Sequence, residues 1–291
     1  MLALGIAAAV TASLLYNTSI ALQALEAREV PGEHGLRPSL LGRLLRNRRW
    51  LGATALGLLG WPFEIAALLL APLTVVQPCI ASGLVLLLWL GATRLGERPG
   101  PREFLAVAAI VGGIAGVAWA APDRSTDHAG AGAIALALVL VALPLAAPYA
   151  LRRPLAGNLH RLGLLATLSA GCGYAWTAIA SKLLTDELAA GTLVLAALWL
   201  ATAAASESLA LLSEMSAVQR RPATQVAPMM FAVQVLVPVL LAPLIFDESW
   251  ANTPLGGAAL LVFIALALAG TVLLAGSKAV AAVMESAHAD D

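Results

Sequence analysis

The chain has 291 residues, of which 60% are hydrophobic and 12% charged, and its acidic and basic side chains cancel to a formal net charge of zero. Apolar stretches of about 20 residues recur along it, and a soluble fold could not hide them all. The composition therefore excludes a soluble domain and predicts an all-α polytopic membrane protein. The absence of excess positive charge gives no support to nucleic-acid binding.

Breaks at proline, glycine and charge clusters divide the apolar sequence into about nine predicted transmembrane helices. The predicted spans are residues 2–24, 50–71, 74–93, 103–121, 133–151, 162–184, 192–215, 223–246 and 254–277.

The basic residues predict the orientation of these spans. With the N-terminus outside and the C-terminus inside, all the arginines except Arg124, together with Lys278, fall on the cytoplasmic side. Positive residues are retained on that side in short loops, so this orientation is expected, in the cell inner (plasma) membrane. The first span lacks a basic leader and runs directly into Arg-rich sequence, which indicates a retained anchor.

The Arg-rich segment at residues 26–50 is too charged to cross the membrane. Its leucines alternate with arginines at roughly helical spacing, which predicts a short helix on the cytoplasmic lipid surface. The alternative is a segment that serves only to set the topology. The leucines concerned are Leu40, Leu41, Leu44 and Leu45.

An internal repeat organises the chain. The heptapeptide Pro72–Pro78 (PLTVVQP) recurs as Pro222–Pro228 (PATQVAP), and each copy opens an apolar run that closes on an acid, Glu97 in the first and Asp247 with Glu248 in the second. The same spacing aligns spans 2, 3 and 4 with spans 7, 8 and 9.

Tyr16 and Tyr174 begin a looser match between spans 1 and 6. Because five spans separate the starts of the two four-helix units, the second unit enters the membrane from the opposite side. The expected architecture is therefore two inverted-topology repeats in a 4+1+4 arrangement. The repeats are residues 1–122 and 162–278, joined by a linker with span 5 at 123–161 and followed by a cytoplasmic tail at 279–291.

Inverted repeats are typical of secondary transporters, whose substrate sites lie where the halves meet. Pro78 and Pro228 cannot donate to the carbonyls of Thr74 and Thr224, which leaves a free backbone oxygen beside each threonine hydroxyl. Each kink either lines a cavity or acts as a hinge, or is a packing kink satisfied by the threonine hydroxyl itself.

Acidic residues inside spans are costly and mark functional sites. Glu64 and Glu214 stand at matching points of spans 2 and 7, each eight residues before the heptapeptide. Glu207 lies two turns before Glu214 on about the same face, deep within its span, which predicts that it is the most buried acid. We expect proton coupling or cation binding; the alternative is a structural ion pair or a neutral, hydrogen-bonded acid.

Lys182 is either a partner of Glu207 or a residue that snorkels to the interface beside Asp186 and Glu187. Further polar residues in the spans either line the same cavity or form interhelical hydrogen bonds. They include Asn17, Gln77, Tyr174 and Gln225.

Enzyme chemistry has little support, because the histidines lie in loops or at termini and no pair of them has metal-ligand spacing. No Gly-rich phosphate loop follows a strand. We therefore expect neither an enzyme nor a cofactor.

The sequence from Gly60 to Glu97, GWPFEIAALLLAPLTVVQPCIASGLVLLLWLGATRLGE, resembles a hairpin of the NIPA-like magnesium transporters, within the EamA-type group of the drug/metabolite transporter (DMT) superfamily. Residues 222–228 and 244–250 are similar to the second-half counterpart. The resemblance implies a ten-helix parent fold in which the Arg-rich segment replaces one helix here, and a central cavity formed by spans 1, 2, 3, 6, 7 and 8.

The family hairpin typically begins with Gly-Glu and carries an Asn, whereas this chain has Gly60-Trp61-Pro62-Phe63-Glu64. Glu64 is the one candidate metal ligand, as a hard oxygen donor for a divalent cation.

Together these observations predict a secondary transporter of a small polar solute or metabolite that works by alternating access, with protons as the candidate coupling ion. The alternatives are a divalent cation transporter of the magnesium type, a lipid or lipid-linked sugar flippase, and a non-transporting membrane scaffold or accessory subunit. The expected partners are a small-molecule or ion substrate and membrane lipids, with a second copy of the chain as a further candidate.

Overall fold

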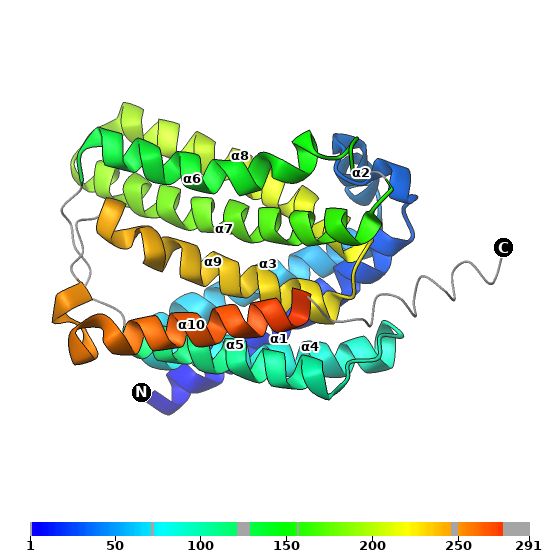
Figure 1. Cartoon of the computed structure of the whole chain (residues 1–291), viewed down its shortest axis with the longest axis horizontal. Coiled ribbons are helices and arrows are strands. Elements are labelled where there is room, and N and C mark those ends of the chain that lie inside the picture. The colour runs from blue at the N-terminus through cyan, green and yellow to red at the C-terminus, as the bar shows by residue number, and fades with distance from the viewer. Residues whose placement is uncertain (1, 71–72, 121–128, 156, 246–249, 276–291) are drawn as a thin grey trace.

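The computed structural model describes residues 2–70, 73–120, 129–155, 157–245 and 250–275, and within these ranges the chain is helical, without β-strands (Figure 1). Each of the nine predicted spans coincides there with one long helix. These helices are α1 (Leu2–Arg28), α3 (Arg48–Leu70), α4 (Leu73–Arg94), α5 (Pro101–Ala120), α6 (Ala131–Ala150), α7 (Leu159–Ala189), α8 (Leu193–Val218), α9 (Ala223–Ile245) and α10 (Ala258–Ala275). The short elements are η1 (Gly32–His34), α2 (Pro38–Leu44), η2 (Trp250–Asn252) and η3 (Pro254–Gly257).

The helices have the composition of membrane spans. In the described part of the chain, seven of them are long and apolar enough to cross a bilayer: α1, α5, α6, α7, α8, α9 and α10, the last counted together with η3. Their outer faces carry large apolar side chains such as Leu143, Val194 and Val272, which are 64%, 85% and 69% exposed. Such surfaces suit hydrocarbon rather than water, so the chain is a polytopic membrane protein.

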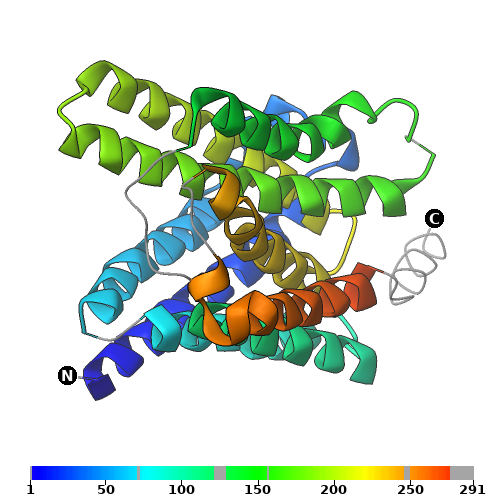
Figure 2. The same cartoon turned by 60° about the vertical axis from the view of Figure 1, so that its left-hand side comes forward.

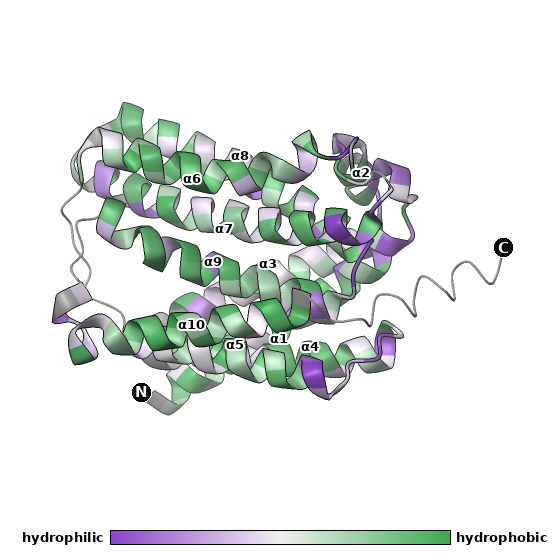
Figure 3. Ribbon diagram, in the orientation of Figure 1, coloured by the Kyte–Doolittle hydropathy of each residue, from purple (hydrophilic) through white to green (hydrophobic). Residues whose placement is uncertain are grey.

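Polar sequence gathers at one end of the helices, on the right in Figure 3, which we call the arginine-rich end. Contacts there show which helix termini meet. Arg28, the last residue of α1, donates to the carbonyl of Val218, the last residue of α8, at 3.0 Å. Arg221, just before α9, donates to the carbonyl of Leu274 near the end of α10 at 3.3 Å.

Because consecutive helices alternate in direction, α1, α4, α6, α8 and α10 end at the arginine-rich end, whereas α3, α5, α7 and α9 begin there (Figure 1). Consequently α1 runs opposite to α7, α3 to α8, α4 to α9 and α5 to α10. These are the pairs that the sequence repeat aligns.

The packing follows the same pairing. Helix α1 packs mainly against α3 and α4, and α7 packs in the same way against α8 and α9, whereas α5 packs against α10. Figure 2 shows α1 and α3 (blue) running side by side, and α7 and α8 (green to yellow-green) running side by side in another layer. Helix α6 lies against α7 and has no counterpart in the first set.

The close crossing of α1 with α4 recurs between α7 and α9. The glycine that permits the close approach lies on α4 in the first crossing and on α7, the counterpart of α1, in the second. A Cβ added at Gly83 of α4 would collide with the Ser13 hydroxyl of α1. In the second crossing the glycine is Gly171 of α7, where an added Cβ would lie 2.6 Å from the Cβ of Val233 on α9. At such distances one partner must lack a side chain, so each crossing needs one glycine.

Small residues also let α5 and α10 approach closely. An added Cβ at Gly113 would lie 2.6 Å from that of Ala267, and one at Gly116 would meet the ring of Phe263. These glycines of α5 therefore serve the close packing of the two helices.

A short helix, α2, forms in the Arg-rich segment as predicted, but two of its four named leucines pack against protein, whereas Leu45 is 58% exposed. Leu40 and Leu44 are 0% exposed and pack with Met215 and Val218 at the end of α8. The amide of Leu36 donates to the Ser216 hydroxyl at 2.8 Å. The apolar face of this short helix covers the end of α8, which offers a better-packed surface than the lipid interface.

Candidate functional site

Two tyrosine–glutamate pairs occupy matching places in the structure. The Tyr16 hydroxyl of α1 donates to the Glu64 carboxylate of α3 at 2.6 Å. The Tyr174 hydroxyl of α7 donates to the Glu214 carboxylate of α8 at 2.5 Å. Three of the predicted site residues, Glu64, Glu214 and Tyr174, are therefore brought into two equivalent contacts, each completed within its own set of helices.

A second pair of contacts has the same spacing along the chain. Ser19, three residues after Tyr16, donates to the carbonyl of Ala53 at 2.7 Å. The Thr177 hydroxyl, three residues after Tyr174, is shared between the carbonyl of Ala203 at 3.4 Å and that of Gly173, in its own helix, at 3.2 Å. The register of α1 on α3 is therefore the register of α7 on α8.

The two carboxylates lie toward opposite ends of the molecule. Glu64 is six residues before Leu70, the end of α3, and Glu214 is four residues before Val218, the end of α8. At 1.5 Å per residue these separations are about 9 Å and 6 Å. Glu214 is thus near the arginine-rich end and Glu64 is near the other end.

Their surroundings also differ. Glu64 is half-buried, whereas Glu214 is only 4% exposed. Next to Glu214 the indole N–H of Trp50 donates to the sulfur of Met215 at 3.4 Å, and α2 packs over the end of α8. A carboxylate with a hydroxyl donor can take up and release a proton or hold a cation, and in this conformation only Glu64 is open to exchange.

Glu207 does not lie where its depth in the span predicted. It is on an exposed face of α8, where the Thr177 hydroxyl approaches it, and so Glu214 rather than Glu207 is the more buried acid. The reason is that α8 is covered near the arginine-rich end, whereas residues 193–209 are mostly exposed. The Gly57 position of α3, which the repeat aligns with Glu207, carries no acid.

Other polar candidates are distributed over several helices. Lys182 pairs with Asp186 at 3.1 Å near the end of α7, as a snorkelling lysine would. Asn17 is 1% exposed and donates to the carbonyl of Ser13 at 2.9 Å, while its side-chain oxygen has no hydrogen-bond partner among the described residues. Pro228 is buried within α9.

The first heptapeptide and the acids after α9 are less fully described. The backbone of α4 passes through Thr74, Gln77 and Pro78, but their side chains lie outside the described part of the structure. Asp247 and Glu248 also lie outside the described residues.

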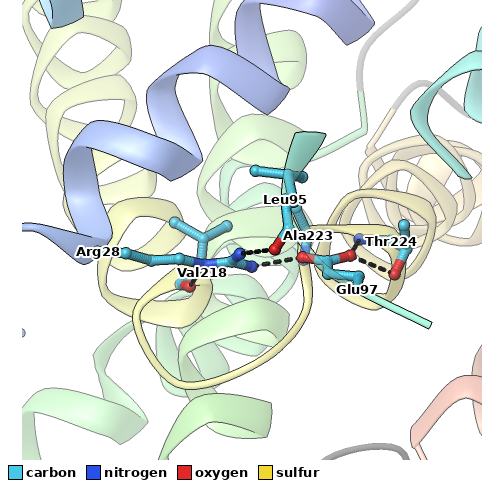
Figure 4. Close-up of polar contacts among 6 residues, drawn as sticks. All are labelled: Arg28, Leu95, Glu97, Val218, Ala223 and Thr224. Carbon is cyan, nitrogen blue, oxygen red and sulfur yellow. Dashed lines mark hydrogen bonds and ion pairs between the residues drawn. The ribbon is translucent and has the colours of Figure 1, made fainter. Parts of the chain in front are cut away.

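Glu97 forms several polar contacts at the arginine-rich end (Figure 4). Its carboxylate accepts from the amides of Ala223 and Thr224 at 2.6 and 3.0 Å and from the Thr224 hydroxyl at 2.5 Å. It also forms an ion pair with Arg28. Glu97 therefore caps the N-terminus of α9, where unpaired amides and the helix dipole favour an anion.

Of this cluster the sequence singled out only Thr224 as a site residue. It marked Glu97 only as the acid that closes an apolar run and Arg28 only as a topology signal, because nothing local places the end of α4 against the start of α9. The packing interpretation of the proline kink required the Thr224 hydroxyl to donate to the free carbonyl of its own helix. In the structure the hydroxyl donates to Glu97 instead.

Two arginines fill the turn between α8 and α9. Arg220 donates to the carbonyl of Ser216 at 2.6 Å, and Arg221, 2% exposed, donates to the side-chain oxygen of Gln225 at 3.1 Å. Desolvation by burial lowers the pKa of both guanidinium groups, although a guanidinium starts so basic that it stays charged. Gln225 thus serves to hold this turn.

No three His, Cys, Asp or Glu side chains converge on a metal-sized site in the described ranges. The structure has an open apolar groove of about 470 Å³ between α6, α7 and α8, lined by residues that include Leu145, Tyr149, Trp176 and Leu209. None of the predicted site residues lines this groove.

The chain matches no family model, no curated protein and no solved structure.

Proposed function

We propose that the chain is a secondary transporter that moves a small polar solute or metabolite across the membrane by alternating access, with protons as the coupling ion. One observation carries the proposal: two sets of helices that run in opposite directions each hold one tyrosine–glutamate pair, at opposite depths. Inverted repeats of this kind let a carrier adopt two conformations of similar energy, open to opposite sides. We assign α1, α3, α4 and α5 to one repeat and α7 to α10 to the other.

The arginine-rich end is the cytoplasmic end in this proposal, because basic residues are retained on that side. The N-terminus is then outside and the C-terminus inside, in the inner membrane. The described conformation is closed toward the cytoplasm, where Glu214 is sealed, and leaves Glu64 half-buried toward the outside. Rocking of the two repeats would exchange these two environments, so that Glu64 would be sealed and could release its proton only before closure, whereas Glu214 would open to the cytoplasm.

The resemblance to the NIPA-like and EamA-type transporters of the DMT superfamily is compatible with this arrangement. Nine long helices in the described residues, with the Arg-rich segment in the place of a tenth, are what that resemblance implies. Magnesium is the less favoured substrate, because the candidate ligand Glu64 pairs with a tyrosine and no carboxylate cluster surrounds it in the described part.

A lipid or lipid-linked substrate is the second candidate. The groove between α6, α7 and α8 is apolar and open, and its volume would accommodate part of an acyl chain. Two leucines of the Arg-rich segment, Leu40 and Leu44, are buried against protein and so give the flippase no further support.

The proposal is tested with the purified protein. A thermal-shift screen against amino acids, sugars, nucleosides, organic acids and Mg²⁺ identifies a stabilising solute, whose uptake is then measured in proteoliposomes with and without a pH gradient. We expect uptake that depends on the gradient and is lost in Glu64→Gln and Glu214→Gln variants that still fold.

Other outcomes separate the alternatives. Stabilisation by Mg²⁺ that is lost in Glu64→Gln would favour the cation transporter. Movement of fluorescent lipids between leaflets would favour the flippase. If no solute stabilises the protein and none is taken up, the chain is a scaffold or accessory subunit and the transporter proposal is wrong.

A further inference from the structure

We propose that Arg28, Glu97 and Thr224 form a latch that holds the two repeats together and closes the cytoplasmic end of the protein. This inference rests on the proposed transport function, because a latch of this kind has a purpose only if the end opens. Opening would require Glu97 to leave the N-terminus of α9.

The latch joins elements of different repeats. Arg28 ends α1 and Glu97 follows α4, both in the first repeat, whereas Val218 ends α8 and Thr224 begins α9 in the second. Arg28 donates to the carbonyls of Val218 and Leu95 at 3.0 and 3.4 Å while pairing with Glu97 (Figure 4). One arginine and one carboxylate therefore connect the ends of four helices.

A reciprocal contact strengthens the same junction. The side-chain amide of Gln219, in the second repeat, donates to the carbonyls of Ala27 and Val30 at 2.9 Å each, at the end of α1. The first repeat thus supplies an acid to the amides that begin α9, and the second supplies a donor to carbonyls at and just after the end of α1. Helix termini need such partners, and here each repeat provides them to the other.

Two further buried acids at this end have described bonds within their own repeat. Glu26, 8% exposed, accepts from Asn47 at 2.6 Å and so links α1 to the start of α3. Glu103 accepts from the amide of Gly100 at 2.9 Å at the start of α5. Glu97 differs from them because its amide and hydroxyl donors all belong to α9.

The latch is partly exposed to water and lies over an apolar contact between the repeats, as expected of a contact that can open and close. The side chain of Glu97 is 4% exposed, but that of Arg28 is 28% exposed, so water can compete for the guanidinium. Immediately beneath, Ala227 of α9 is 0% exposed and packs in an apolar cluster with Ala21 and Leu84 of the first repeat. The closed latch therefore covers a dry seam between the repeats.

The test measures the accessibility of that seam. The reporter is the Ala227→Cys variant in a background in which Cys79 and Cys172 are replaced by alanine. The protein is reconstituted in liposomes, and its thiol is reacted from the cytoplasmic face with a bulky, membrane-impermeant maleimide. Labelling rates are compared among variants that retain the wild-type gel-filtration profile.

We expect Glu97→Gln to raise the labelling rate by at least about tenfold, because the population of the open end increases when its closed form loses the ion pair. Thr224→Val removes one donor and leaves the ion pair, so an increase of about threefold is expected. Glu26→Gln is the matched control, a buried acid at the same end whose described bond stays within one repeat, and should change the rate less than about twofold.

The latch is wrong if Glu97→Gln and Thr224→Val label no faster than Glu26→Gln. If Glu97→Gln does not fold, the Thr224→Val comparison decides alone. The labelling readout does not require a substrate, so it separates the two proposals. Faster labelling without uptake of any solute would support the latch and contradict the transporter proposal. Uptake without faster labelling would support the transporter proposal and contradict the latch.

Discussion

The Tyr16–Glu64 and Tyr174–Glu214 pairs have the same internal contacts and different surroundings. Each tyrosine hydroxyl meets its glutamate at 2.5 to 2.6 Å, and a hydroxyl one turn further along each tyrosine helix donates to a carbonyl of the glutamate helix. Yet Glu214 is sealed and Glu64 is half-buried. The helix pair determines the contact, whereas the exposure of each carboxylate depends on how far other elements cover that part of the helix.

The largest expected effect is on transport. Glu64→Gln and Glu214→Gln should each lower pH-gradient-driven uptake by about 100-fold, the scale expected when a proton-transfer group is removed. Glu207→Gln, on an exposed face and without a counterpart in the first repeat, should lower it by less than about threefold. Initial uptake rates in proteoliposomes measure both, and a larger loss in Glu207→Gln than in Glu214→Gln would reverse our ranking of the acids.

The difference in exposure is the next prediction. In the background without native cysteines, Glu64→Cys should react with an impermeant maleimide at least about tenfold faster than Glu214→Cys, because only the first position is open in this conformation. Mass spectrometry of the labelled protein measures the ratio. Equal rates would mean that the described conformation is not the one that predominates in the membrane.

Replacing the glycine at one of the two close helix crossings should destabilise the protein. Gly171→Ala should lower the free energy of unfolding by about 1–3 kcal/mol, as expected when a side chain overfills a packed crossing. A second substitution, Val233→Ala, should restore part of the loss, because it shortens the opposing side chain. Thermal unfolding in detergent measures both variants. Gly52→Ala, where an added Cβ meets nothing within 4 Å, is the control and should be close to neutral.

The smallest effect is expected at the second matched contact. Ser19→Ala should destabilise the protein by about 1 kcal/mol, and Thr177→Val by less, because the Thr177 bond is the longer of the two. The same unfolding assay tests the order. A larger effect at Thr177 would show that its approach to Glu207 outweighs its bond to Ala203.

Much of the fold was readable from the sequence, because membrane helices are marked by their own composition. All nine apolar runs are helices in the described residues, and the repeat that began with the two proline heptapeptides matches helices of opposite direction. The link between Tyr16 and Tyr174 was loose in sequence and became specific only when each tyrosine was found on its aligned glutamate.

What the sequence missed depends on contacts between distant elements. The depth of Glu207 in its span was correct, but depth along a helix does not say which face is covered. The leucines of α2 have an amphipathic pattern that suits lipid and protein equally, and the end of α8 decides between them. Glu97 required the knowledge that α4 ends beside the start of α9.

The exchanged glycine at the two helix crossings affects how sequence similarity between the two sets of helices is detected. Gly83 belongs to α4 and Gly171 to α7, so the aligned positions read Gly opposite Val and Ser opposite Gly, two mismatches in a comparison made one column at a time. When the four residues are compared as contacting pairs, both pairs meet the same requirement, a glycine on one of the two crossing helices. When the required glycine moves from one helix of a crossing to the other, the packing of the two helices is kept but the sequence identity at both positions is lost. A search for distant relatives should therefore score contacting pairs of residues.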